Sequence, residues 1–269
     1  MPDRKPSAAA LARRADTGGH IHRGPGPGLV HRFVGRAFRQ GAPRAASRAL
    51  LLLQLAATAA VLGWVPGNLV KLAAMLAIWA IGFRRLSGAE LLVMLGVDVI
   101  FVFANSGALR NGVFRFAHPD VLGMPVFEFF MWGFYTLHTI RVVGGRPPRF
   151  QPIATLILVA LFAAAFSTIR EPRLLLIVAA AIVAAGLGWF RERADFACAG
   201  YMIALGALIE YIGVGTGQWG YPASPVGGVP LWFVPMWGGV GLFTRRLFLP
   251  ALDRLQSSWP DRSPPDRDL

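Results

Sequence analysis

The chain has 269 residues, of which 55% are hydrophobic and only 15% are charged, and its formal net charge is +13. Soluble domains contain about 25% charged residues, so this composition disfavours an ordinary soluble enzyme. The single cysteine, Cys198, excludes a disulfide framework and a cysteine-based zinc site.

The first 48 residues are polar and basic, and they contain no apolar segment that would indicate a cleavable signal peptide. Residues 1–28 are rich in Pro, Gly, Ala and Arg, which predicts disorder. In the segment 29–40, LVHRFVGRAFRQ, the apolar residues fall on one helical face and the arginines elsewhere. This pattern suits a short helix lying on anionic lipid, and a solvated arm is the open alternative.

Eight apolar segments follow, each close to the length of about 20 residues that crosses a bilayer. They are continuously apolar and rich in Ala and Leu, which favours helices over a β-barrel. The sequence therefore predicts an all-α integral membrane protein with about eight transmembrane helices. The predicted spans are 49–66, 68–84, 87–105, 121–141, 152–168, 173–190, 194–213 and 228–249.

The basic residues favour one orientation of these spans. Of the 27 Lys and Arg residues, 22 lie in the N-terminal tail or directly after the second, fourth, sixth and eighth spans. The positive-inside rule then places both termini in the cytoplasm, as in a multi-pass protein of the cell (inner) membrane. This bias also explains the basic charge, and no nucleic-acid-binding motif accompanies it, so no nucleic-acid partner is expected.

The second half of the chain repeats the first at an offset of 105 residues. The repeat predicts two parallel four-helix units, at 49–145 and 150–250, because four crossings return the chain to its starting side. Residues 251–269 are predicted to form a disordered cytoplasmic end. The matching residues are Gly112, Phe114 and Phe116 with Gly217, Trp219 and Tyr221, Gly123 and Pro125 with Gly228 and Pro230, and Met131, Trp132 and Gly133 with Met236, Trp237 and Gly238.

Each repeat also carries an aromatic pair in a loop that the predicted topology places on the outer side. Phe114 and Phe116 are two residues apart, as are Trp219 and Tyr221, so each pair points to one face of an extended segment. These side chains either anchor their loops at the lipid headgroups or fold over a cavity shared by the two repeats. Pro125 and Pro230 are predicted as first-turn prolines of the helices that follow.

Three acidic residues, Asp98, Glu128 and Glu210, lie within predicted spans. A carboxylate at the centre of a membrane helix costs about 2.5 to 3.5 kcal/mol, and it indicates function by default. Glu128 and Glu210 lie at similar depth, and their repeat partners are Phe233 and Asn105. One acid from each half, at non-equivalent positions, predicts an asymmetric acid/base site between the repeats.

The alternative for Glu128 and Glu210 is that they pair with Arg110 or Arg115 and only fasten helices together. Asp98 either joins the same cavity or forms hydrogen bonds within the bundle. Two further acids, Glu90 and Asp195, are sufficiently explained by their places near helix N-termini. The sequence contains no HExxH or GxSxG motif, and no metal or cofactor is expected.

Two segments resemble carotenoid-modifying membrane proteins. NGVFRFAHPDVLGMPVFEFF, at 111–130, resembles the small lycopene cyclase membrane domain of the heterodimeric bacterial and fungal type. EYIGVGTGQWGYPASPVGGVPLWFVPMW, at 210–237, is similar to the membrane-bound carotenoid hydratase family. Pro125 and Glu128 match the cyclase motif, whereas Phe127 stands at the position of its first glutamate. In the second repeat Trp and Phe replace both acids.

The resemblance implies a cofactor-free cyclase or hydratase that acts on a carotenoid or another polyisoprenoid within the bilayer. Glu128 or Glu210, protonated in an apolar cavity, would give its proton to a terminal double bond, and Asp98 and Asn105 would position water or the partner acid. The predicted substrate-binding residues are Asn105, Phe114, Phe116, Trp132, Trp219, Tyr221 and Trp237. Aromatic faces such as those of Trp132, Trp219, Tyr221 and Trp237 would stabilise the cation. The alternative is a non-catalytic membrane protein, either a carrier or binding protein for a lipid or isoprenoid, or a scaffold subunit for other membrane enzymes. The sequence leaves the choice, and the oligomeric state, open.

Overall fold

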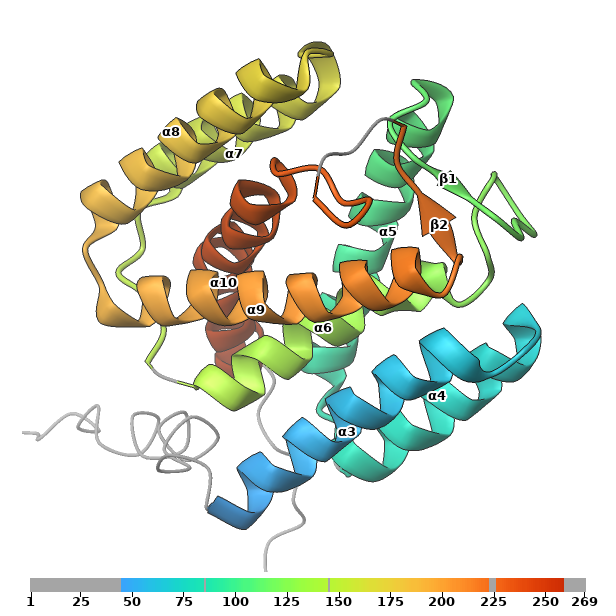
Figure 1. Cartoon of the computed structure of the whole chain (residues 1–269). Helices are drawn as coiled ribbons and strands as arrows, with labels where there is room; N and C mark the ends of the chain where they lie inside the picture. Colours follow the sequence, from blue (N-terminus) through green and yellow to red (C-terminus); the bar gives the residue numbers. More distant parts are fainter. Residues whose placement is uncertain (1–44, 85, 145, 223–225, 259–269) are drawn as a thin grey trace, which may run out of the picture.

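A computed structural model describes residues 45–84, 86–144, 146–222 and 226–258. Within these ranges the chain is helical apart from loops and two short strands (Figure 1). The predicted helix at 29–40 and the rest of the segments 1–44 and 259–269 lie outside the described residues. The elements are α3 (Ala45–Trp64), α4 (Asn68–Phe83), α5 (Gly88–Arg110), β1 (Arg115–Phe116), α6 (Glu128–Val143), α7 (Pro152–Thr168), α8 (Pro172–Phe190), α9 (Arg193–Gly215), β2 (Trp219–Gly220) and α10 (Phe233–Ser258).

Local sequence signals set several of the helix starts. Helix α5 begins with a capping box, in which the Ser87 hydroxyl accepts a hydrogen bond from the Glu90 amide and the Glu90 carboxylate accepts one from the Ser87 amide. Helices α7 and α8 begin with Pro152 and Pro172, where a missing backbone donor costs nothing. These starts lie within a residue of the predicted ones.

Among the described residues, four segments are long and apolar enough to cross a membrane: Ser47–Trp64, Gly88–Arg110, Pro172–Phe190 and Arg193–Gly215. Helices α4 and α7 are apolar but shorter, with 16 and 17 residues. By length and apolarity these helices are those of a multi-pass helical membrane protein. Helix α6 is central to the bundle, since every residue from 131 to 139 is buried.

Two helices begin later than predicted. Helices α6 and α10 start at Glu128 and Phe233, whereas the predicted spans start at 121 and 228. The reason is a tight turn before each helix, closed by the β-bridges Val121–Met124 and Val226–Val229. Pro125 and Pro230 come directly after these bridges and before the first residues of α6 and α10. They are therefore not first-turn prolines, contrary to the prediction. Helix α10 also continues past its predicted end to Ser258, through Pro250.

The structure repeats at the predicted offset in its element bounds and turn geometry. Helix α9 begins and ends 105 residues after α5. The turns that follow them share hydrogen bonds, from Val113 to the Ala108 carbonyl and from Gln218 to the Gly213 carbonyl. The aromatic segments then pair with each other, because β1 and β2 form an antiparallel ribbon in which Phe116 lies opposite Trp219.

Helices α5, α6, α9 and α10 form the centre of the bundle (Figure 1). Helix α5 packs on α6, α9 packs on α10, and α6 crosses α9. The hairpin of α3 and α4 packs through α3 on α9 and α6, whereas the hairpin of α7 and α8 packs on α10. The two hairpins therefore flank the centre, the first mainly against α9 and α6 and the second mainly against α10.

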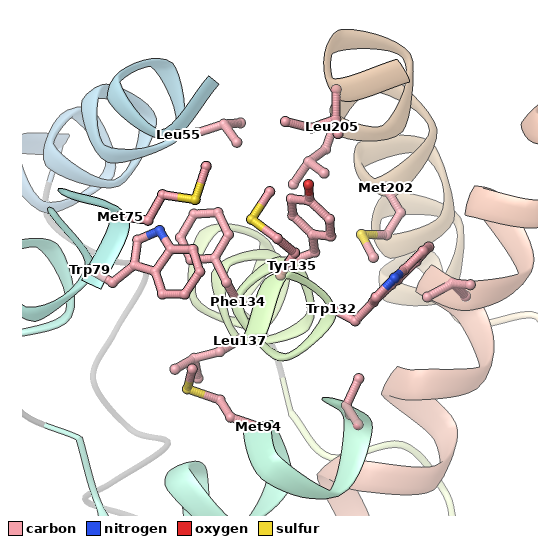
Figure 2. Close-up of a cluster of buried hydrophobic side chains, with 14 of the residues drawn as sticks. Leu55, Met75, Trp79, Met94, Trp132, Phe134, Tyr135, Leu137, Met202 and Leu205 are labelled. Carbon is pink, nitrogen blue, oxygen red and sulfur yellow. The ribbon is translucent and has the colours of Figure 1, made fainter. Parts of the chain in front are cut away.

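The main hydrophobic cluster is built around α6 (Figure 2). Phe134 stacks on Trp79 of α4, with ring centroids 4.5 Å apart. Its neighbour Tyr135 meets Trp237 of α10 edge-on, at 5.3 Å between centroids. Successive residues of α6 thus face the first hairpin and the last helix, which joins the two halves in one core.

Ion pairs lie at the N-terminal ends of α9 and α5. Asp195, at the start of α9, bonds both Arg245 and Arg246 of α10, and all three side chains are buried. Glu90 accepts from Arg141 at 2.9 Å. A place near a helix N-terminus was thus an insufficient account of Asp195 and Glu90, because the arginines that pair with them come from helices distant in sequence.

Candidate functional site

A cavity of about 1110 Å³ lies between α5, α7, α8 and α10. The segments that carry β1 and β2 cover one end of it, and α6 and α9 contribute the two glutamates, Glu128 and Glu210. The lining is largely apolar. Of the residues predicted for the site, Asn105, Phe114, Phe116, Glu128, Trp132, Glu210, Trp219, Tyr221 and Trp237 line this one cavity, and Asp98 does not.

Glu210 lies between two glycines on one face of α9. Gly206, Glu210 and Gly213 are spaced so that they share one helix face. The Trp237 ring lies over Gly206, where an added Cβ would meet it at 2.2 Å, and the Trp219 ring lies over Gly213, where the distance would be 2.1 Å. Only glycine allows the two indoles to approach so closely that both reach Glu210.

The two indoles donate to different oxygens of that carboxyl group. Trp219 Nε1 lies 2.9 Å from Glu210 Oε2, and Trp237 Nε1 lies 3.2 Å from Oε1. The Tyr221 hydroxyl adds a third contact, 2.8 Å from Oε2. An indole N–H can only donate, so both oxygens of Glu210 act as acceptors. The Glu210 side chain is only 4% exposed and its hydrogen-bonding capacity is largely used within the protein.

Glu128 is held by two donors on one oxygen. Asn105 Nδ2 lies 3.0 Å and Trp132 Nε1 lies 3.1 Å from Glu128 Oε1. Glu128 Oε2 accepts no hydrogen bond from any residue in the described ranges. Because the side chain also lines the cavity, Glu128 is the carboxyl group with capacity left for a bound molecule.

A tryptophan stack connects the two carboxyl groups. Trp132 and Trp237, which are repeat partners, stack with centroids 4.8 Å apart and an interplanar angle of 22°. The first indole donates to Glu128 and the second to Glu210. Phe101 stacks on the opposite face of Trp132, with centroids 3.9 Å apart. The repeat thus supplies a matched aromatic pair, whereas the acids that it orients come from non-equivalent positions.

The aromatic pairs of the two loops meet over the cavity. Phe116 of β1 lies edge-on to Trp219 of β2, with centroids 5.9 Å apart, and Phe114 lies at the same distance from Tyr221. All four rings line the cavity. Of the two alternatives for these residues, this position corresponds to folding over the cavity, and the four rings contact one another there.

Two of the open alternatives are now decided by geometry. Within the described ranges, the partners of Glu128 and Glu210 are Asn, Trp and Tyr side chains, and neither Arg110 nor Arg115 is among them. Asp98 has a packing role, because its carboxylate accepts from the Gly133 amide at 2.6 Å where α5 meets α6. It does not line the cavity, contrary to its prediction as a site residue.

Several residues of the site were not predicted. Gly206 and Gly213 could have been found, because glycines four residues before and three residues after Glu210 put three residues on one helix face. Phe101 and Tyr135 carried no such signal, since aromatic residues are common in apolar helices. In the part of the chain that the structure describes, no group of three or more His, Cys, Asp or Glu side chains is placed to hold a metal ion.

Comparisons with family models and with curated proteins found no match for this sequence. Among solved structures, the chain is similar to a mycobacterial Insig homologue, MvINS from Mycobacterium vanbaalenii, with a TM-score of 0.55 and 19% sequence identity. The match covers 63% of this chain and 97% of that one, and a cross-linked trimer of MvINS gives the same values. At this identity the likeness shows the fold.

The expected membership of the carotenoid-modifying proteins is wrong, because the fold is similar to that of an Insig homologue. The motifs misled for a physical reason. Gly112 and Gly217 have φ of 69° and 70°, and Gly123 and Gly228 both have φ of 79°. Any chain with these turns needs glycine there, so the motifs report turn geometry and do not identify a family. The protein is a helical integral membrane protein with an Insig-like fold.

Proposed function

We propose that the protein binds a neutral lipid from the bilayer in this cavity and does not transform it. The hydrocarbon part of the lipid lies against the walls from α5, α7, α8 and α10, and a hydroxyl group of the lipid bonds to Glu128. The observation that carries this proposal is the arrangement at Glu128, where Oε1 accepts from Asn105 and Trp132 while Oε2 has no partner among the described residues.

The chemistry of the cavity supports a hydroxyl as the polar group. A hydroxyl both donates and accepts, so it matches Glu128 whether the carboxyl group is ionised or protonated. Most other lining residues are apolar or aromatic. An apolar cavity with few convergent polar groups is typical of small-molecule sites, and 1110 Å³ lies just above their usual range of about 300–1,000 Å³. This size suits a lipid.

The proposal includes a topology. We infer eight crossings in two four-helix repeats of the same orientation, with both termini in the cytoplasm of a cell whose inner membrane holds the protein. The repeated turns and the offset of α5 and α9 support the duplication, and the clustering of Arg141, Arg245 and Arg246 at one end supports the orientation. Binding of anionic lipid by the basic tail stays a prediction.

The proposal is tested by photolabelling. The purified full chain is placed in phosphatidylcholine vesicles with a diazirine derivative of dodecanol, irradiated, digested and analysed by mass spectrometry. Label is expected on peptides that line the cavity, such as 97–112 and 127–137. Unlabelled dodecanol should compete for this label, whereas dodecane of the same chain length should compete poorly because it lacks the hydroxyl.

Two variants of Glu128 separate binding from catalysis. Glu128→Leu removes the polar partner and should weaken competition by dodecanol about tenfold, as for one hydrogen bond to a charged group. Glu128→Gln keeps a donor and an acceptor and should keep most of the binding. Label confined to outward-facing residues, without competition by dodecanol, would refute the proposal. A chemically altered lipid that disappears with Glu128→Gln would show that the protein is an enzyme.

A further inference from the structure

The two halves of the structure differ in one interface. In the first half, α3 packs directly on α9 of the other repeat. The corresponding pair in the second half is α7 and α5, and no comparable packing joins them within the described residues. Helix α7 instead packs on α8 and α10. The space left between α5 and α7 is part of the cavity.

Close contacts seal the α3–α9 side. A Cβ added to Gly63 of α3 would lie 3.0 Å from Ile212 and 3.3 Å from Thr216, so the two helices touch at this point. Nearby, the buried Lys71 of α4 bonds the side chain of Gln218, in the turn after α9. The two helices are thus in contact on this side.

The residues at the corresponding positions on the other side leave a gap. Subtracting 105 from Ile212, Thr216 and Gln218 gives Gly107, Asn111 and Val113, and adding 105 to Lys71 gives Leu176. All four of these counterparts line the cavity. At Gly107 an added Cβ would meet no atom within 4 Å. An isoleucine thus closes one side where a glycine leaves the other side open.

We propose that the gap between α5 and α7 is a lateral portal, through which a lipid enters the cavity directly from the bilayer. The proposal rests on the proposed function and adds the route of the ligand. Phe103 and Ile100 of α5 line the cavity and are also 73% and 54% exposed. Ala163 and Ser167 of α7 likewise line the cavity and are exposed. These rim residues lie on membrane-spanning helices, so the opening faces hydrocarbon.

One hydrogen bond crosses the end of the portal. Arg170, in the turn between α7 and α8, donates to the Asn111 side chain after α5 at 3.1 Å, and both residues line the cavity. The next residue, Glu171, caps α8, and the amides of Arg173 and Leu174 hold the pKa of its carboxyl group below the ordinary value. The turn that carries Arg170 is therefore anchored, and the Arg170–Asn111 bond acts as a clasp.

The portal is tested by the time course of photolabelling after the diazirine dodecanol is added to vesicles that contain the full chain. Gly107→Phe fills the gap and should slow labelling of peptide 127–137 about tenfold or more. Gly96→Phe is the matched control, because Gly96 is on the same helix with nothing within 4 Å of an added Cβ, and it does not line the cavity. Arg170→Ala opens the clasp and should speed labelling about two- to fivefold.

These variants act in opposite directions, so a general loss of folding cannot produce the expected pattern. Equal labelling rates for the wild type, Gly107→Phe and Gly96→Phe would overturn the portal. If unlabelled dodecanol still competed for the label in that case, the proposed function would stand. Absence of competition in the wild type would overturn both. Slow entry in Gly107→Phe together with faster entry in Arg170→Ala would support the lateral route.

Discussion

The close approach of Trp219 to Gly213 of α9 can be tested directly, because replacing one hydrogen atom of the glycine by a methyl group should displace the indole ring. In Gly213→Ala the new Cβ would lie 2.1 Å from Trp219 Cζ2 and 2.2 Å from Cη2, whereas ordinary van der Waals contact begins at 3.4 Å. The Trp219 ring must therefore move by more than about 1 Å. The backbone of a helix cannot supply this movement without breaking its own hydrogen bonds.

The expected cost follows from two contributions. Overpacking of a filled core typically costs about 1–3 kcal/mol. The 2.9 Å bond from Trp219 to Glu210 is lost as the ring moves, which costs about 1–3 kcal/mol for a buried group left unsatisfied. A total loss of about 2–4 kcal/mol lowers the melting temperature of a chain of this size by about 5–15 °C.

The measurement is the thermal loss of helical circular dichroism in detergent, with a matched glycine as the control. Gly200 is also on α9, but an added Cβ meets nothing within 4 Å there, so Gly200→Ala should be neutral or slightly stabilising. Gly213→Ala should also lose competition by dodecanol. The melting temperatures of the two variants should therefore differ by at least about 5 °C. A difference of less than about 2 °C would mean that Trp219 does not approach α9 closely and that the geometry described for Glu210 is wrong.

Three further substitutions test the roles assigned outside the cavity. Asp195→Asn removes the fully buried carboxylate that bonds Arg245 and Arg246 and leaves them the more exposed Glu192 as their carboxylate partner, so it should cost up to about 3–5 kcal/mol in thermal unfolding. Glu90→Gln, in a partly exposed pair, should cost about 1 kcal/mol. Equal losses would contradict the burial of the Asp195 cluster. Asp98→Ala removes the acceptor of the Gly133 amide and should lower the free energy of unfolding by about 1–3 kcal/mol. It should leave competition by dodecanol unchanged. A change in that competition would mean that Asp98 belongs to the site.

The sequence by itself determined the helical membrane class and much of the order of elements. Apolar runs of span length can be stable only as helices that satisfy their own backbone in lipid, so α3, α5, α8 and α9 were predictable from composition. The offset of 105 was equally visible, because glycines with positive φ recur in both halves. Turn residues misled elsewhere, since β-bridges before Glu128 and Phe233 delay helices that hydrophobicity alone would start earlier.

The tertiary structure decided how the repeats differ. Sequence alone marked Glu128 and Glu210 as costly acids, but only packing showed that aromatic donors saturate Glu210 and leave Glu128 with an unused oxygen. Likewise, nothing in the sequence distinguishes Gly107 from other helical glycines. Its role follows only from the packing of its counterpart, Ile212, which closes the opposite side. A repeat specifies two similar folds, whereas a cavity depends on contacts between helices distant in sequence, which local patterns do not encode.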